Sequence, residues 1–300
     1  MTKTADLAQL AGLQAYTDVI GVGNLYETSL GYAAGALNTG SRNTFVGFYA
    51  GTANLSGSDV CAFGSSSLSS NTTGANNTAV GSYSALSNTT GSSNCAFGYY
   101  SLAVNSTASS NSAFGHLSLT YCTASNNSAF GNLALVNTST GSFNTAVGSL
   151  AGSSLTTGGN NTCIGANAQP STATVTSEIT LGDGLISALR CATTTITSLS
   201  DERDKKNIID LPAGLAFINA VRPVAFDWNA RDESKVDIPD TGFLAQNLQQ
   251  VQAQLGITIP GLVYDTNPDK LEAGYSKLLP VLVKAIQELS ARVEALEAAA

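Results

Sequence analysis

The chain has 300 residues, a formal net charge of −8 and only 11% charged side chains. This acidic balance excludes a surface that attracts nucleic acid or anionic lipid by charge alone. No apolar run reaches the roughly 18 residues that a membrane-spanning helix needs. Asp6, Gln9 and Gln14 interrupt any signal-peptide core near the N-terminus. We therefore expect a protein that is made in the cytoplasm and does not insert into a membrane.

Groups that commonly bind metals or cofactors are scarce. The five cysteines show no Cys-x-x-Cys spacing: Cys61, Cys95, Cys122, Cys163 and Cys191. An odd and dispersed set argues against a disulfide framework or a zinc site. A single histidine, His116, leaves little for His-based chemistry, and Gly21 and Gly23 lack the third glycine of a dinucleotide fingerprint. The sequence predicts no cofactor and no metal.

Residues 1–30 form the least patterned part of the chain. Leu7, Leu10 and Leu13 have the spacing of one face of a short helix. We expect this segment to be a cap or an attachment point for a neighbouring protein.

A repeat fills residues 31–182, where one glycine returns every 16 or 17 residues. These repeat glycines are Gly31, Gly47, Gly64, Gly81, Gly98, Gly115, Gly131, Gly148, Gly165 and Gly182. Phe, Val, Ile or Leu precedes the glycine, alanine usually stands two residues before it, Thr, Ser or Cys three before it, and Asn four before it. A fixed period of this length predicts units that stack and bury a shared core.

Each unit is interpreted as a short strand followed by turns. Period-2 alternation places Phe or Val with Thr, Ser or Cys on one face, and Ala with Asn on the other. Stacked asparagines can then bond amide to amide. We expect a mainly β fold, a β-solenoid or β-roll of about nine coils. One Phe or Val per coil makes a thin core, which favours a homotrimer of such rods, although a monomeric solenoid stays possible.

The repeat offers little for catalysis. Between Asn43 and Ser177 the only charged side chain is Asp59, whereas acid–base work on sugars needs two carboxylates. Aromatic residues follow several repeat glycines and either form a sugar-stacking stripe with His116 or pack between chains: Phe48, Tyr49, Tyr83, Tyr99 and Tyr100. Packing between chains is the favoured interpretation.

Beyond a linker strand at 183–199, charges become dense from Ser200 onward and indicate a second, α+β domain at 200–300. Its expected elements are helices at Ala213–Val221, from Gly242 through Val251, and after Gly274, with strands at Pro223–Trp228 and Gly261–Tyr264 and a charged loop at Arg231–Asp240.

The last helix has a heptad pattern. Leu279, Ile286 and Val293 fall at a positions, and Leu282, Leu289 and Leu296 at d positions. This pattern predicts a short coiled coil between copies. The alternative is a single amphipathic helix on a local core.

Several motifs in this domain carry a family resemblance. Ser-Asp-x-Arg-x-Lys-x-x-Ile from Ser200 is followed by Pro-Val-x-Phe-x-Trp, Gly-Phe-Leu-Ala-Gln, Tyr-Ser-Lys-Leu and Ala-Ile-Gln-Glu-Leu. Over residues 199–298 the chain resembles the C-terminal intramolecular chaperone of endosialidase-type phage tailspikes and tail fibres. Asp204 departs from the family, which often has Leu there. The repeats resemble, more loosely, fibre and adhesin-head β-rolls.

The resemblance implies a domain that trimerises and folds a β-rod and then releases itself. The family's serine and lysine roles fall on Ser200 and Lys205, and the cut is expected beside Ser200, on its carboxyl side before Asp201. A serine hydroxyl needs a base, and lysine serves only as the neutral amine, which burial and the cations Arg203 and Lys206 favour. The acidic neighbours Asp201, Glu202 and Asp204 oppose this unless they turn outward.

The resemblance also implies partners and a location. We expect a virion tail fibre or tailspike, made in the host cytoplasm, that is a homotrimer, contacts other tail or baseplate proteins, and binds a host surface glycan or protein receptor. The alternatives are a bacterial trimeric surface adhesin with the same chaperone and a chaperone that is retained uncleaved. A glycan-degrading spike and a released DNA-binding factor are disfavoured by the nearly charge-free repeat.

Overall fold

A computed structural model describes residues 27–186, 189–190, 200–231 and 235–300. The chain divides into two compact units, one ending at Asp183 and one beginning at Gly184. The expected helix at Leu7–Leu13 and most of the expected linker strand lie outside the described residues.

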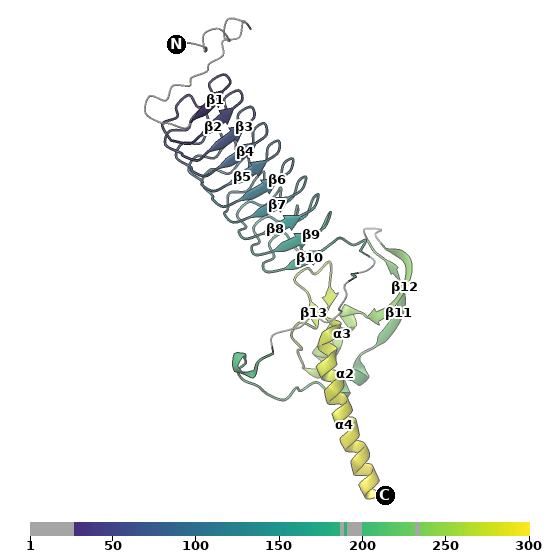
Figure 1. Ribbon diagram of the computed structural model, residues 1–300. Helices are drawn as coiled ribbons and strands as arrows, with labels where there is room; N and C mark the ends of the chain where they lie inside the picture. The colour runs from purple at the N-terminus through teal and green to yellow at the C-terminus, as the bar shows by residue number, and fades with distance from the viewer. Residues whose placement is uncertain (1–26, 187–188, 191–199, 232–234) are drawn as a thin grey trace, which may run out of the picture. The chain divides into compact units, whose positions relative to one another are not determined.

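The N-terminal unit is a parallel β-solenoid, as Figure 1 shows. Its ten strands form one sheet in sequence order. They are β1 Thr28–Leu30, β2 Thr44–Val46, β3 Cys61–Phe63, β4 Thr78–Val80, β5 Cys95–Phe97, β6 Ser112–Phe114, β7 Ser128–Phe130, β8 Thr145–Val147, β9 Thr162–Ile164 and β10 Ile179–Leu181. Each strand pairs in register with its equivalent one coil away, for example Ala79 with Ala96. The expected solenoid of 17-residue coils is confirmed.

The core of this unit differs from the expectation. The two faces of each strand were assigned correctly, but the Phe or Val column points outward, and the middle column, mostly alanine, points inward. Leucines from the following turns fill the interior: Leu68, Leu102, Leu119, Leu135 and Leu155. Each coil is closed so tightly that the inward strand position usually admits only a small side chain. A single chain therefore buries a core of its own.

Two columns of buried asparagine bind neighbouring coils together. In the expected column, four residues before the repeat glycine, Asn94 Oδ1 accepts from the backbone N–H of Asn111 at 3.0 Å, and Asn94 Nδ2 donates to the Ala108 carbonyl at 2.9 Å. A second column, in the less regular half of the repeat, bonds amide to amide: Asn88 Nδ2 donates to Asn71 Oδ1 at 2.8 Å. These bonds satisfy polar groups that would otherwise be costly to bury.

The repeat glycines are required by the close stacking of coils. Gly64 has φ +137°, and a Cβ there would lie 2.5 Å from the carbonyl oxygen of Gly81. Any side chain at this position would therefore collide with the backbone of the next coil.

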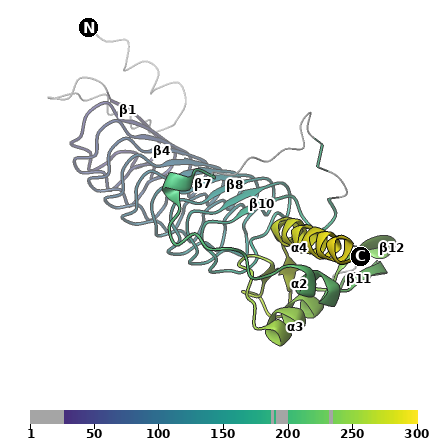
Figure 2. The same cartoon turned by 90° about the horizontal axis from the view of Figure 1, so that it is seen from below.

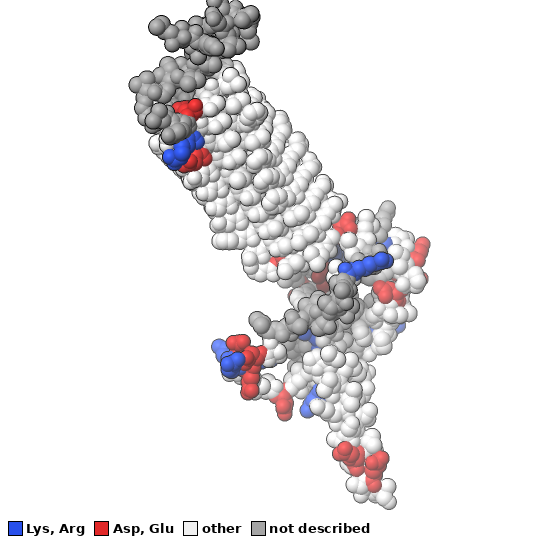
Figure 3. Space-filling model, in the orientation of Figure 1, with Lys and Arg blue, Asp and Glu red and all other residues white. Residues whose placement is uncertain are grey.

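Charged side chains are sparse along the solenoid face that Figure 3 shows. Arg42 and Asp59 form an ion pair between adjacent coils, with Nε 2.6 Å from the carboxylate. Every other residue from 43 to 177 is uncharged.

The C-terminal unit is a small α+β assembly (Figures 1 and 2). Its elements are the 3-10 turn η1 Glu202–Asp204, α2 Leu215–Ala220, β11 Pro223–Asn229, β12 Val236–Phe243, α3 Ala245–Leu255, β13 Val263–Tyr264, β14 Glu272–Ala273, η2 Tyr275–Lys277 and α4 Leu278–Ala299. Phe217, Leu248 and Val281 are buried where α2, α3 and α4 meet. Among the described residues, none of the helices combines the length and apolarity needed to cross a bilayer.

Two expected elements were wrong in part. The helix expected from Gly242 begins at Ala245, because Gly242 and Phe243 belong to β12. Arg231–Asp240 was interpreted as a charged loop, but β12 begins at Val236 and pairs antiparallel with β11, so that Phe226 faces Asp240. This two-stranded sheet is largely exposed, and its strands therefore tolerate charged residues that a buried strand would not.

Candidate functional site

The segment that follows Ser200 folds back on itself. The Asp201 carboxylate caps η1 by accepting from the Arg203 backbone N–H at 2.9 Å, and the Arg203 guanidinium lies 2.6 Å from the same carboxylate. These two bonds, the side-chain bond first, hold the pKa of Asp201 below its ordinary value. The Lys205 N–H then donates to the Glu202 carbonyl at 3.0 Å. This turn returns the Lys205 side chain to Ser200.

The two residues expected to react are in contact. Lys205 Nζ lies 2.8 Å from Ser200 Oγ and 3.1 Å from the Ser200 carbonyl oxygen. The first distance permits a proton to pass between hydroxyl and amine. The second places a donor against the carbonyl of the bond that joins Ser200 to Asp201, where it can polarise that bond.

The charged residues near Lys205 differ in whether they are paired with an opposite charge. Asp201 and Arg203 neutralise each other, whereas Glu202 and Asp204 are exposed and belong to η1. Lys206 is therefore the remaining cation of the run beside Lys205. Within the described residues, Ser200 and Lys205 are both exposed, so the burial that would favour the neutral amine is not supplied by the C-terminal unit itself.

Two of the family-like motifs contact each other. The Tyr275 hydroxyl donates to the Phe243 carbonyl at 2.9 Å and accepts from the Phe243 N–H at 3.3 Å. The rings of these residues meet edge to face, with centroids 5.4 Å apart. The Tyr-Ser-Lys-Leu motif thus fixes the end of β12, where the Gly-Phe-Leu-Ala-Gln motif begins.

Glu288 is a structural residue that the sequence did not reveal. Helix α2 starts without a side-chain cap of its own, and Glu288 from α4 accepts from the Leu215 N–H at 2.8 Å. A Cβ on Gly214 would lie 2.5 Å from Glu288 Oε2. The last helix therefore stabilises the first helix of the unit from 73 residues away, a separation that no local pattern reports.

Helix α4 carries two apolar stripes. Leu278, Val281 and Ala285 are buried in the unit. The heptad residues form a different stripe and are exposed: Leu279, Leu282, Ile286, Leu289, Val293 and Leu296. The local core therefore does not account for the heptad.

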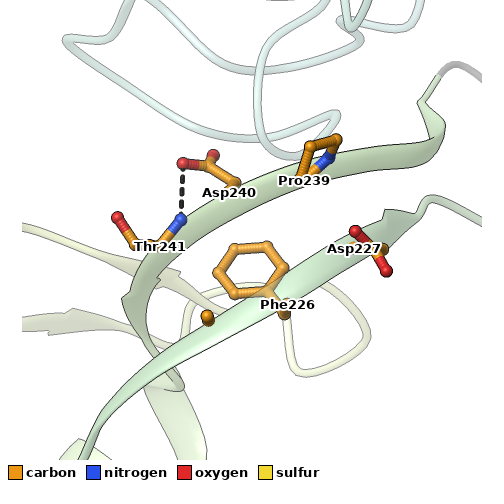
Figure 4. A pocket seen from close by; sticks show the side chains of 6 residues that line it. Phe226, Asp227, Pro239, Asp240 and Thr241 are labelled. Carbon is orange, nitrogen blue, oxygen red and sulfur yellow. Dashed lines mark hydrogen bonds between the residues drawn. The ribbon is translucent and has the colours of Figure 1, made fainter.

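A shallow depression lies on the β11–β12 pair and is shown in Figure 4. It is lined by Ala225, Phe226, Asp227, Pro239, Asp240 and Thr241. Because Asp227 pairs with Pro239 and Asp240 with Phe226, the two carboxylates lie on opposite faces of the sheet. Bonds from the Thr241 N–H and the Trp228 indole lower the pKa of Asp240. The two acids do not converge on a common ligand.

Comparison with known proteins identifies the C-terminal region. Residues 200–257 match the family described as chaperone of endosialidase, and the match starts at Ser200. Searches of curated proteins and of solved structures returned no match. A repeat solenoid followed by this domain fits a tail-fibre-type protein with a C-terminal intramolecular chaperone. The match confirms the resemblance noted from the sequence motifs over residues 200–257.

Proposed function

We propose that this chain is the precursor of a homotrimeric virion tail fibre or tailspike that binds a host receptor. Its C-terminal domain aligns three chains, promotes the folding of their solenoids, and then detaches by self-cleavage at Ser200. The carrying observation is that the match to the chaperone family begins at the residue whose hydroxyl lies 2.8 Å from the Lys205 amine.

Assembly through this domain is supported by α4. Six apolar residues at heptad spacing are exposed, although α4 already buries a separate stripe in its own unit. An exposed heptad stripe favours packing against the same helix of other copies. The homotrimer comes from the family resemblance, since a short seam does not set the number of strands.

The need for such a domain follows from the repeat. Coils of nearly identical sequence pair almost as well when one chain is shifted by one coil. A domain that aligns the chains before the rods associate removes this ambiguity. Its release leaves a product that persists because disassembly is slow.

The proposed cleavage consumes one water molecule. The Lys205 amine, in its neutral form, takes the Ser200 hydroxyl proton, and Oγ in turn takes a proton from a water that attacks the Ser200 carbonyl carbon. The amide nitrogen of Asp201 leaves with the proton held by Lys205. The water is needed because attack by Oγ on its own carbonyl would close a four-membered ring. Attack by Oγ on the carbonyl of residue 199 instead would cut one residue earlier.

The test uses single-residue variants of the full chain. Ser200→Ala and Lys205→Ala are expected to give only full-length polypeptide on a denaturing gel. Lys206→Ala, which removes the adjacent lysine, is expected to give two fragments like the unaltered chain. Two fragments of normal size from either dyad variant would refute the dyad, and intact mass separates a cut after Ser200 from one before it.

A further inference from the structure

The outward face of the solenoid sheet carries an unbroken apolar column. The residue that precedes each repeat glycine forms it, and we call this set the outer apolar column: Leu30, Val46, Phe63, Val80, Phe97, Phe114, Phe130, Val147, Ile164 and Leu181. None of these ten side chains is buried, and Leu30, Phe63 and Leu181 are more than half exposed. Phe97 and Phe114 stack with centroids 4.7 Å apart and rings 7° from parallel.

The apolar character of this column is not required by the strands themselves. Three residues before the repeat glycine, the other outward column is made mainly of Thr, Ser and Cys in the same strands. Threonine favours strands about as well as valine. The core is already filled by the inward alanines and the turn leucines. A second surface must therefore explain why no polar residue stands in the outer apolar column.

We propose that the outer apolar column is the surface on which a second copy of this chain packs, parallel and coil against coil. This inference rests on the proposed function, in which the C-terminal domain aligns the copies. The proposal adds which face of the rod they bury.

The exposed area suits this occupant. If each member exposes on the order of 60 Å², about a third of an aromatic side chain, the column presents roughly 600 Å², which is about three quarters of one partner's share of a standard stable interface. A continuous apolar surface of this size marks an interaction site.

The spacing and charge of the column also suit a second copy. Its members recur once per coil, at about the 4.8 Å strand spacing, and a parallel copy presents the same spacing over its whole length. The column contains no charge, so two copies meet without repulsion. The ion pair of Arg42 and Asp59 lies five residues before the repeat glycine, outside the column.

The aromatic residues after the repeat glycines are less suited to continuous packing. Tyr99 stacks on His116 with centroids 5.6 Å apart. In the same column, however, Ser65, Ser82 and Asn132 interrupt the aromatic residues. We therefore assign packing between chains to the outer apolar column and not to this aromatic stripe.

Photochemical crosslinking of the full chain tests the proposal. The photoreactive p-benzoylphenylalanine replaces Phe114 in the column or, as the matched control, Phe143, which is 63% exposed and lies five residues before a repeat glycine. After irradiation, the Phe114 position is expected to yield covalently joined copies, with the link mapped to Phe97, Phe114 or Phe130 of the other copy. The Phe143 position is expected to yield at least fivefold fewer covalently joined copies.

The other outcomes are distinguishable. An oligomer that crosslinks equally at both positions, only from Phe143, or into a C-terminal domain overturns the proposal and leaves the proposed function standing. A lone protomer by native mass overturns both. As a second measurement, Phe97→Thr with Phe114→Thr should lower the thermal midpoint of the oligomer. Phe143→Asn should not, because the backbone at Phe143 is left-handed and the equivalent position in other coils carries asparagine, for example Asn126. An unchanged midpoint in the double variant also contradicts the proposal.

Discussion

Phe45 and Gly51 are a matched exception in the solenoid core. Phe45 takes the inward strand position that alanine occupies in most coils, and it is fully buried. Gly51 takes the turn position at which other coils carry a buried leucine, such as Leu68. A Cβ on Gly51 would collide with the Phe45 ring. One large residue and one small residue have exchanged places, and the interior of the coil stays filled.

This exchange predicts compensation between the two sites. Phe45→Ala should destabilise the solenoid by about 3–5 kcal/mol because it leaves a cavity, and Gly51→Leu should destabilise it by overpacking. The double variant restores the Ala62–Leu68 pattern of the next coil and should recover at least half of the larger loss. Denaturant unfolding followed by circular dichroism measures all three. A double variant whose loss equals the sum of the single losses would show that the residues are independent.

The ion pair between coils predicts a pH dependence at the N-terminal end of the rod. The Arg42 side chain, through its hydrogen bonds, lowers the pKa of Asp59 from its ordinary value of 3.8. A depressed pKa stabilises the folded state above the ordinary value, and this stabilisation is lost as the pH falls through the folded pKa. Because both side chains are exposed, the effect should be small and weakened by salt.

Asp59→Asn is the variant for that measurement. Its stability should fall less than that of the unaltered chain as the pH drops below 4 at low salt. The same pair of profiles at about 1 M salt provides the control, because salt screens an exposed ion pair and should bring the two profiles together. Identical pH profiles for the unaltered chain and Asp59→Asn at low salt would contradict the prediction.

The contact between Glu288 and α2 predicts a tertiary helix cap. Glu288→Ala should destabilise the C-terminal domain by about 1–2 kcal/mol because the Leu215 N–H loses its acceptor. Gly214→Ala should have a similar effect because it displaces the same carboxylate. Glu294→Ala, an exposed change on the same helix, should cost under about 0.5 kcal/mol. Thermal unfolding of the full chain, followed by the circular dichroism signal of its helices, compares the three variants. Equal effects of the Glu288 and Glu294 changes would argue against the cap.

The exposed heptad predicts dependence of assembly on α4. Leu289→Asp places a charge in the seam and should shift the full chain toward monomer in native mass measurements, with a larger uncleaved fraction. Gln287→Asp places the same charge on the same helix outside the a and d positions and should leave assembly unchanged. Normal assembly of the Leu289 variant would remove α4 from the interface.

The repeat made the fold predictable, but not the interior of each coil. The spacing of glycine, alanine and asparagine gave the solenoid and the faces of its strands. The buried leucines could not be foreseen, because residues such as Leu102 adopt φ near +50°, a conformation that costs about 1–2 kcal/mol outside glycine. Stacking on neighbouring coils offsets that cost, and stacking is invisible in a single repeat.

The shortened coil between Gly115 and Gly131 also has a feature that the sequence does not predict. Asn94 and Asn127 each donate to a carbonyl 14 residues further along. Because the coil between Gly115 and Gly131 is one residue short, the equivalent of that acceptor, Ala124, lies only 13 residues after Asn111. Within the described residues, Asn111 Nδ2 is the buried side-chain polar atom that lacks a partner. The sequence shows the shortened coil, and only the structure shows which bond it removes.

The candidate site was predictable because its parts are close in sequence. Ser200 and Lys205 are five residues apart, and the intervening run contains Asp201, which caps the turn that joins them. The support of Glu288 for α2 arises only after the chain has folded. Sequence motifs therefore located the candidate pair but missed part of the frame that holds the domain together.

The central claim is that an aligning domain detaches from an assembled rod. Intact mass of the denatured protein, combined with native mass of the same sample, tests it most directly. The account predicts two polypeptides whose masses sum to that of the 30.5 kDa chain plus one water, with the larger one in a stable trimer. A single full-length polypeptide that is a stable monomer would contradict both the assembly and the release.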